Sequence, residues 1–138
     1  MRGYAVMIST KGRYAVRVMI DLAEHIDEKN VPLKDIADRQ QISKKYLEAI
    51  VKDLVSSGLV KGSSGKGGGY RLIKNPDEYT VGEIIEGTEG PLASVKCIAD
   101  DDFDCPRKTI CQTLPMWEEF DGMVHDYFYN KKLSDLTK

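Results

Sequence analysis

Three cysteines, Cys97, Cys105 and Cys111, fall within fifteen residues in the second half of the 138-residue chain. The thiolate is the form of cysteine that binds metal or reacts with oxidants, so this grouping predicts one local site rather than scattered core residues. Because an odd number of clustered cysteines does not build a disulfide framework, metal binding or redox sensing is the favoured chemistry. A zinc site would prefer closer spacing and a fourth Cys or His.

Charge is divided unevenly along the chain. Residues 1–75 hold 14 Lys or Arg against 8 Asp or Glu, a balance of +6, whereas residues 76–138 hold 6 against 14, a balance of −8. A basic half beside an acidic half indicates a surface for a polyanion, with solvated helix faces as the alternative interpretation. No apolar run approaches the roughly 20 residues of a membrane span, and the N-terminus lacks a signal-peptide pattern. We therefore expect a cytoplasmic protein with no membrane partner.

Helical periodicity in the first half predicts a helix-turn-helix. A first amphipathic helix, with Ser9 or Thr10 as its N-cap, is followed by a short helix that begins at Pro32 and a turn at residues 40–42. A third helix then has Ser43 as N-cap and Gly58 as its C-terminal stop. The first apolar stripe comprises Tyr14, Ala15, Val18, Met19, Leu22, Ala23 and Ile26, and the buried side of the third helix comprises Tyr46, Leu47, Ile50, Val51, Leu54 and Val55.

The residues after the turn are the candidates for reading DNA, because the second helix of such a pair enters the major groove by its N-terminal end. They are Ser43, Lys44, Lys45, Tyr46 and Glu48. Lysines suit phosphate or guanine, and Glu48 can accept a hydrogen bond from cytosine. The alternative interpretation is that the lysines are ordinary surface residues and that Tyr46 belongs partly to the core.

A glycine-rich loop between two short segments predicts a β-hairpin wing. The strands are expected at residues 59–61 and 70–73, with Lys66 at the tip of the loop. Glycines permit positive backbone angles and close approach to a nucleic-acid backbone. The expected DNA-binding residues of the wing are Lys66, Gly67 and Gly68.

The acidic half predicts two further helices. Thr80 with Glu83 forms a capping box, and Thr113 with Pro115 can open a long last helix. That helix carries a wide apolar and aromatic face, which fits a subunit interface better than packing against its own small domain. The face comprises Leu114, Met116, Trp117, Phe120, Met123, Val124, Tyr127 and Phe128.

No arrangement of catalytic residues can be read from the sequence. His25 and His125 lie on separate helices, and the glycine-rich loop fails the P-loop pattern because Val60 replaces its first glycine and Gly67 its Ser or Thr. We therefore expect no enzyme activity and no catalytic residues.

Four segments, taken in order, resemble the winged-helix transcription regulators of the IscR, NsrR and CymR family. They are Ile8-Ser9-Thr10-Lys11-Gly12-Arg13-Tyr14-Ala15, Ile42-Ser43-Lys44-Lys45-Tyr46-Leu47-Glu48, Gly67-Gly68-Gly69-Tyr70 and Val81-Gly82-Glu83-Ile84-Ile85. The resemblance implies a mainly α fold with a small β-hairpin wing. It places a winged helix-turn-helix DNA-binding domain at residues 7–80, and a helix, a cysteine loop and a dimerisation helix at residues 81–138, after an N-terminal extension at residues 1–6.

The resemblance also implies a homodimer on a double-stranded DNA operator and an iron–sulfur cluster, [2Fe-2S] or [4Fe-4S], held by Cys97, Cys105 and Cys111. The seven residues between the first two cysteines exceed the family's usual spacing of about five, which a loop absorbs at little entropic cost. The histidine that IscR uses as a fourth ligand is replaced here by Leu114, and the aspartate of an NsrR subtype by Arg13. The other candidates are an external ligand and the loop aspartates Asp100, Asp101, Asp102 and Asp104.

The sequence therefore predicts a transcription regulator, acting as a repressor, whose operator affinity is set by an iron–sulfur cluster. A cluster-free CymR-like regulator of cysteine metabolism, or a thiol redox sensor, is the alternative. A small iron–sulfur electron carrier is a further class, but electron transfer has no need for a helix-turn-helix with a wing.

Overall fold

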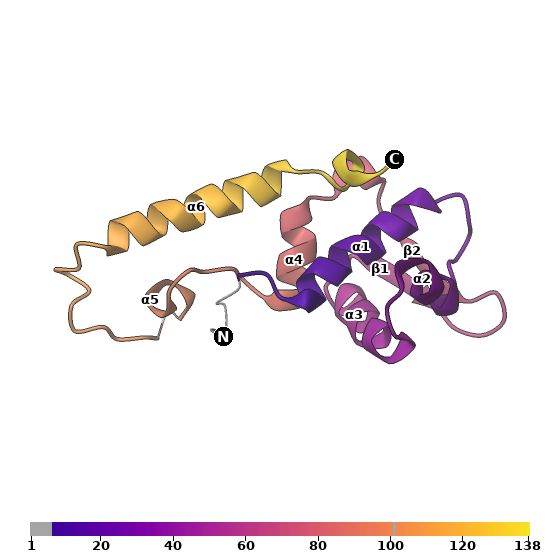
Figure 1. Cartoon of the computed structure of the whole chain (residues 1–138), viewed down its shortest axis with the longest axis horizontal. Helices are drawn as coiled ribbons and strands as arrows, with labels where there is room; N and C mark the ends of the chain where they lie inside the picture. The colour runs from indigo at the N-terminus through magenta and orange to yellow at the C-terminus, as the bar shows by residue number, and fades with distance from the viewer. Residues whose placement is uncertain (1–6, 101) are drawn as a thin grey trace, which may run out of the picture.

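The computed structural model describes residues 7–100 and 102–138, so the predicted N-terminal extension at residues 1–6 lies outside the described residues. The fold is mainly helical with one two-stranded antiparallel hairpin, which confirms the predicted fold class (Figure 1). The elements in chain order are α1 (Thr10–Glu24), α2 (Leu33–Gln40), α3 (Lys44–Ser56), β1 (Val60–Ser63), β2 (Gly69–Leu72), η1 (Pro76–Glu78), α4 (Val81–Glu89), α5 (Lys96–Ala99), α6 (Leu114–Asn130) and η2 (Leu133–Leu136).

The predicted caps delimit the helices of the helix-turn-helix. The Ser9 hydroxyl accepts a hydrogen bond from the Gly12 N–H at 3.2 Å, and the Ser43 hydroxyl accepts one from the Tyr46 N–H at 3.2 Å. Between α2 and α3 the chain turns at Gln41, which lies in the left-handed region with φ 57°. Gly58, with φ 74°, follows the end of α3, where only glycine takes up this conformation at no steric cost.

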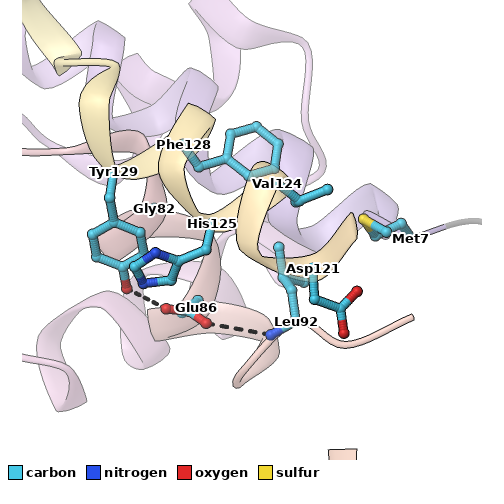
Figure 2. Close-up of a pocket in the computed structure, with 9 residues that line it drawn as sticks. All are labelled: Met7, Gly82, Glu86, Leu92, Asp121, Val124, His125, Phe128 and Tyr129. Carbon is cyan, nitrogen blue, oxygen red and sulfur yellow. Dashed lines mark hydrogen bonds between the residues drawn. The ribbon is translucent and has the colours of Figure 1, made fainter. Parts of the chain in front are cut away.

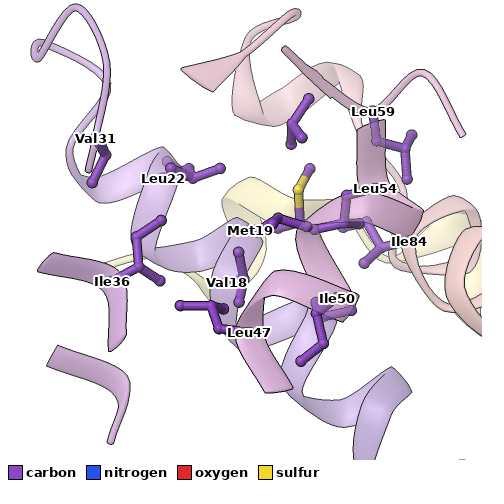
Figure 3. Packing of buried hydrophobic residues seen from close by; sticks show 14 of the residues in the cluster. Val18, Met19, Leu22, Val31, Ile36, Leu47, Ile50, Leu54, Leu59 and Ile84 are labelled. Atoms are coloured by element: carbon purple, nitrogen blue, oxygen red, sulfur yellow. The ribbon is translucent and has the colours of Figure 1, made fainter. Parts of the chain in front are cut away.

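The hydrophobic core lies between α1, α2, α3, α4 and the hairpin, and Figure 3 shows the packing of its buried residues. Two predicted core positions are wrong: Ile26 is 47% exposed because α1 ends before it, and Val55 is 42% exposed because it lies roughly 90° around α3 from the middle of the buried face. Fully or nearly fully buried members of the core are Val18, Met19, Leu22, Val31, Ile36, Leu47, Ile50, Val51, Leu54, Tyr79, Ile84 and Leu133.

A buried carboxylate fixes α1 against α2. Asp21 is only 1% exposed, and its oxygens accept hydrogen bonds from Arg39 at 2.8 and 3.0 Å and from the Gln40 side chain at 3.0 Å. A buried charge is tolerated only when it is paired and hydrogen-bonded, as it is here. The Asp21 carboxylate raises the pKa of Arg39, mainly through these hydrogen bonds.

The wing is a short hairpin that is anchored at its base. Val60 pairs with Leu72 and Ser63 with Gly69, so the strands are shifted slightly from the predicted ranges. The hydroxyl of buried Tyr79 donates to the carbonyl oxygen of Leu59 at 2.7 Å and accepts from the backbone N–H groups at positions 73 and 74. Tyr79 thus holds both ends of the hairpin to the segment that leads into α4.

The C-terminal segment leaves the domain and returns to it. Figure 1 shows α6 extending away from α1, α2 and α3, with α5 beneath it. Beyond the end of α6, Leu133 of η2 is fully buried in the core, and the Leu133 N–H donates to the Tyr79 carbonyl at 3.1 Å. The predicted capping box at Thr80 and Glu83 is present at the start of α4. No helix in the described part of the chain is both long and apolar enough to span a membrane.

Candidate nucleic-acid interface and cysteine loop

The N-terminal end of α3 presents a mixture of charges. Lys44, Lys45 and Glu48 are exposed, which leaves their side chains available for contact with a partner. Ser43 is also exposed, but its hydroxyl already caps the helix. Tyr46 is half-buried and packs edge-on against Tyr14 of α1, with the ring centroids 5.9 Å apart. The structure therefore divides the predicted residues into outward-facing side chains and two that also hold α3 in place.

The wing tip presents Lys66 on a hydrogen-bonded turn. Lys66 and Gly67 are exposed, and Gly67 has φ 77°, a conformation that favours glycine. The N–H of Gly68 donates to the Gly65 carbonyl at 3.0 Å, which closes the turn. The side chain of Asn30, in the loop between α1 and α2, donates to the Gly67 carbonyl at 3.1 Å. Sequence reasoning missed this support, because nothing local connects residue 30 to the wing.

The three cysteines are free thiols, each partly exposed. Cys97 lies in α5, whereas Cys105 and Cys111 lie in the connection between α5 and α6. Within residues 7–100 and 102–138, no three His, Cys, Asp or Glu side chains are gathered closely enough to hold a metal ion. The donor set is nevertheless the one that iron–sulfur clusters use, since three soft thiolates lie on one short segment. The donor chemistry fits, and closure of this segment would be needed to gather the sulfur atoms.

Cys111 differs from the other two cysteines in its surroundings. Its Sγ atom lies 3.4 Å from the Thr113 hydroxyl oxygen, at the N-terminal end of α6. Hydrogen bonds from the Thr113 side chain, and then from the backbone N–H groups of Thr113 and Leu114, lower the pKa of Cys111, with a further contribution from the charge of Arg107. The thiolate form is therefore favoured at this position.

Leu114 and Arg13 carry no donor suited to iron. The loop aspartates and an external ligand therefore remain the expected candidates for a fourth ligand. Asp100 accepts a hydrogen bond from the Asp102 N–H at 3.0 Å within the loop. Asp101 lies outside the described residues.

The segment leading to Cys97 is held by both α4 and α6. The Glu86 carboxylate of α4 accepts hydrogen bonds from the Tyr129 hydroxyl of α6 and, at 3.3 Å, from the Leu92 N–H (Figure 2). The Asp121 carboxylate of α6 accepts from the Ser94 N–H at 3.1 and 3.2 Å. Glu86, Leu92, Asp121 and Tyr129 line a small cavity of about 20 Å³ between the two helices. The start of the cysteine loop is thus tied to the helix that packs on α1 and to the long C-terminal helix.

Comparison with known proteins gives one consistent result. The Rrf2 profile, described as an iron-dependent transcriptional regulator, matches residues 8–138. The chain is 37% identical over 131 residues to the HTH-type transcriptional regulator IscR of Vibrio campbellii, covering 95% of this chain and 77% of the relative. The IscR of Aliivibrio salmonicida is 38% identical over 129 residues, covering 94% and 76%.

Two solved structures have a similar fold. CymR, the global cysteine regulator of Bacillus subtilis, superimposes with a TM-score of 0.75 at 37% identity and 96% coverage of both chains. The IscR of T. potens superimposes with a TM-score of 0.74 at 38% identity, covering 97% of this chain and 86% of the other.

Proposed function

The chain belongs to the Rrf2 family and is a DNA-binding transcription regulator rather than an enzyme, and we propose that it is a homodimeric repressor that controls its operator through a cysteine-bound centre. The observation that supports the proposal best is the Ser43-capped helix α3, which presents exposed lysines in the same domain as a wing that presents Lys66. Operator binding would place the protein with the DNA in the cytoplasm.

In this proposal α3 reads the major groove and the wing enters the neighbouring minor groove. Lys44 and Lys45 bind phosphate or guanine, and Glu48 accepts from cytosine. Ser43 and Tyr46 hold the helix at the angle that these contacts need. Lys66, with Gly67 and Gly68 beside it, places one positive charge and a bare backbone against the minor groove.

Dimerisation through α6 follows from its surface. Met116, Phe120, Met123 and Tyr127 are all between 42% and 65% exposed, and they recur at spacings of four, three and four residues along one side of α6. Such an apolar seam is the pattern by which two helices pair. A two-fold dimer would read half-sites separated by about one helical turn of DNA, roughly 34–36 Å, or a multiple of it.

Cys97, Cys105 and Cys111 are the residues that would hold an iron–sulfur cluster. Such a cluster would supply a redox centre, which takes up and gives back electrons. Oxidation or a shortage of iron would remove the cluster from the protein. Leu92 and Ser94 precede Cys97 and donate hydrogen bonds to Glu86 of α4 and Asp121 of α6, so a change in the cysteine segment would act on both helices. Because α4 packs on α1 and α3, the state of the loop can shift the population of recognition-helix orientations.

The test is to measure iron and acid-labile sulfide per protomer on protein purified without oxygen, together with operator affinity before and after removal of iron. We expect stoichiometric iron and sulfide in the unmodified protein and in Thr109→Ala, an exposed control within the same loop. Both should be lost in Cys105→Ala, and operator affinity should then no longer respond to iron. Colourless protein without sulfide, even after reconstitution, would contradict cluster binding.

A cluster-free thiol sensor is the second candidate, and the environment of Cys111 favours it. A thiolate stabilised at a helix N-terminus reacts with peroxide faster than an ordinary thiol. In that case mild peroxide would alter operator affinity in iron-free protein, and Cys111→Ser would remove the response.

A further inference from the structure

Two arginines of α1 flank one aromatic ring beside the recognition helix. The guanidinium carbon of Arg17 lies 4.9 Å from the centroid of the Tyr14 ring, and that of Arg13 lies 5.5 Å from it. Arg13 is exposed and Arg17 is half-buried. Because Arg13 and Arg17 are one helical turn apart, they project on the same side of α1.

The same ring makes the contact with the recognition helix. Tyr14 meets Tyr46 at a ring-centroid distance of 5.9 Å and an interplanar angle of 63°. Tyr46 lies in the first turn of α3, next to the exposed residues Lys44 and Lys45. The arginines of α1 therefore border the end of α3 that would enter the groove.

Arg17 is also fixed to the helix-turn-helix itself. Its Nε–H donates to the side-chain oxygen of Gln40 at 3.3 Å, and its Nη2 donates to the Gln40 backbone carbonyl. Gln40 ends α2 and also donates to Asp21 at 3.0 Å. A guanidinium carries five N–H donors, so these two bonds orient the group and leave three donors for another acceptor.

From this arrangement we infer that Arg13 and Arg17 form a phosphate clamp that extends the DNA interface from α3 onto α1. The partner is the sugar–phosphate backbone of duplex DNA just outside the base-reading contacts. Arginine suits this role because its planar group stacks on an aromatic ring and offers paired donors to phosphate oxygens. The inference rests on the proposed operator binding and adds to it contacts that carry no base preference.

Phosphate contacts have a signature that base contacts lack. Each one releases condensed counterions, so losing one flattens the slope of log affinity against log salt by about 0.9 and weakens all sequences alike. Losing a base contact would instead reduce the preference for the operator over other DNA.

The test uses full-length protein with two fluorescent duplexes, an operator selected by the unmodified protein from a random pool and a scrambled duplex of the same composition. Affinity is measured across a salt series for Arg13→Gln, Arg17→Gln and Arg17→Lys. The control is Lys132→Gln, an exposed cation on the C-terminal segment away from α3. Thermal unfolding checks that each variant is folded. If loss of the Gln40 hydrogen bonds destabilises Arg17→Gln, the Arg13→Gln variant still tests the phosphate contact.

We expect each glutamine variant to bind both duplexes about three- to tenfold more weakly, with a salt slope shallower by about 0.9. Arg17→Lys should keep the slope, and Lys132→Gln should match the unmodified protein. Unchanged slopes in folded Arg13→Gln and Arg17→Gln, with the unmodified protein binding its operator, would overturn the clamp alone. Failure of the unmodified protein to bind any duplex would overturn the proposed operator binding and the clamp together.

Discussion

The Tyr129 hydroxyl donates a hydrogen bond to the Glu86 carboxylate and so joins α6 to α4. Glu86 also accepts from the Leu92 N–H at the start of the cysteine loop, which makes this carboxylate common to three parts of the chain. The ring of Tyr129 lies against Gly82, where a Cβ atom would collide with it. The pair thus connects α6 and the segment that leads to Cys97 with α4, the helix that packs on α1 and α3.

Tyr129→Phe should weaken this connection without removing the ring. Loss of one hydrogen bond to a carboxylate should lower the free energy of unfolding by about 1–2 kcal/mol, measured by urea denaturation. Operator affinity should then respond less to the state of the cysteines. Tyr127→Phe is the matched control, since Tyr127 is 62% exposed on the other side of α6. A full response in Tyr129→Phe would mean that the signal travels by another route.

The same residue predicts a loss of stability in alkali. Burial, together with the hydrogen bond to Glu86 and its charge, raises the pKa of Tyr129 to about 12. An ordinary tyrosine has a pKa near 10, so the stabilisation is fully present below pH 10 and is lost as the pH rises toward 12. We expect the stability of Tyr129→Phe to fall less steeply over that interval. Parallel curves for the two proteins would contradict the assignment.

Asp21→Asn should be strongly destabilising. It removes a buried charge that accepts three hydrogen bonds and leaves the Arg39 guanidinium without its partner. We expect a loss of about 2–3 kcal/mol in the free energy of unfolding, with α2 losing hydrogen-exchange protection first. Asp27→Asn, in the exposed loop after α1, should change stability by less than about 0.5 kcal/mol.

Gln41→Gly should stabilise the protein. Gln41 has φ 57°, a left-handed conformation that costs a residue with a Cβ roughly 1 kcal/mol and glycine almost nothing. Part of that gain is offset by the greater freedom of glycine in the unfolded chain, so we expect about 0.5 kcal/mol by chemical denaturation. Asp38→Gly, on the exposed side of α2, should instead destabilise by about 1 kcal/mol. A destabilising Gln41→Gly would show that the side chain has a role of its own.

Glu83→Gln isolates the charge in the α4 capping box. Burial disfavours the charged carboxylate, but the Thr80 N–H and hydroxyl and the Lys74 ammonium outweigh it and hold the pKa of Glu83 below its ordinary value. The stabilisation is therefore present above the ordinary glutamate pKa of about 4.3 and is lost as the pH falls below it. We expect the variant to be less stable by about 0.5 kcal/mol at pH 7 and equal to the unmodified protein near pH 3. A difference that persists at pH 3 would point to packing rather than charge.

Met123→Glu should disrupt the proposed dimer. Met123 is 65% exposed in the apolar seam of α6, and a charge there would be buried between two copies. We expect sedimentation to show monomers and operator affinity to fall at least a hundredfold. Glu118→Gln, at an exposed position on the opposite side of α6, should leave the dimer intact. If the unmodified protein is itself monomeric in sedimentation, the proposed dimer is wrong.

The amino-acid sequence by itself determined the elements that depend on nearest neighbours. Ser9, Ser43 and Thr80 cap helices through contacts that span three residues, and Gly58 ends α3 because of its own backbone freedom. The apolar periodicity of α1 and α3 identified the core except at Ile26 and Val55. These features are legible because both partners in each interaction lie within one helical turn.

Only the tertiary structure decided the contacts between distant segments. Tyr79 is hydrogen-bonded to the base of the wing, Leu133 is buried in the core, and Arg17 is hydrogen-bonded to Gln40. In each case the partners are far apart in the sequence, and no local pattern connects them. The cysteines illustrate the same limit, since their spacing identifies a donor set, whereas only the structure shows that no metal-binding group of side chains is gathered within the described residues. Only the structure, too, shows that Glu86 and Asp121 hold the segment before Cys97. Long-range contacts form only when the entropic cost of closing the intervening loop is offset by the free energy of packing elsewhere. That balance depends on all the contacts of the fold and not on a local segment.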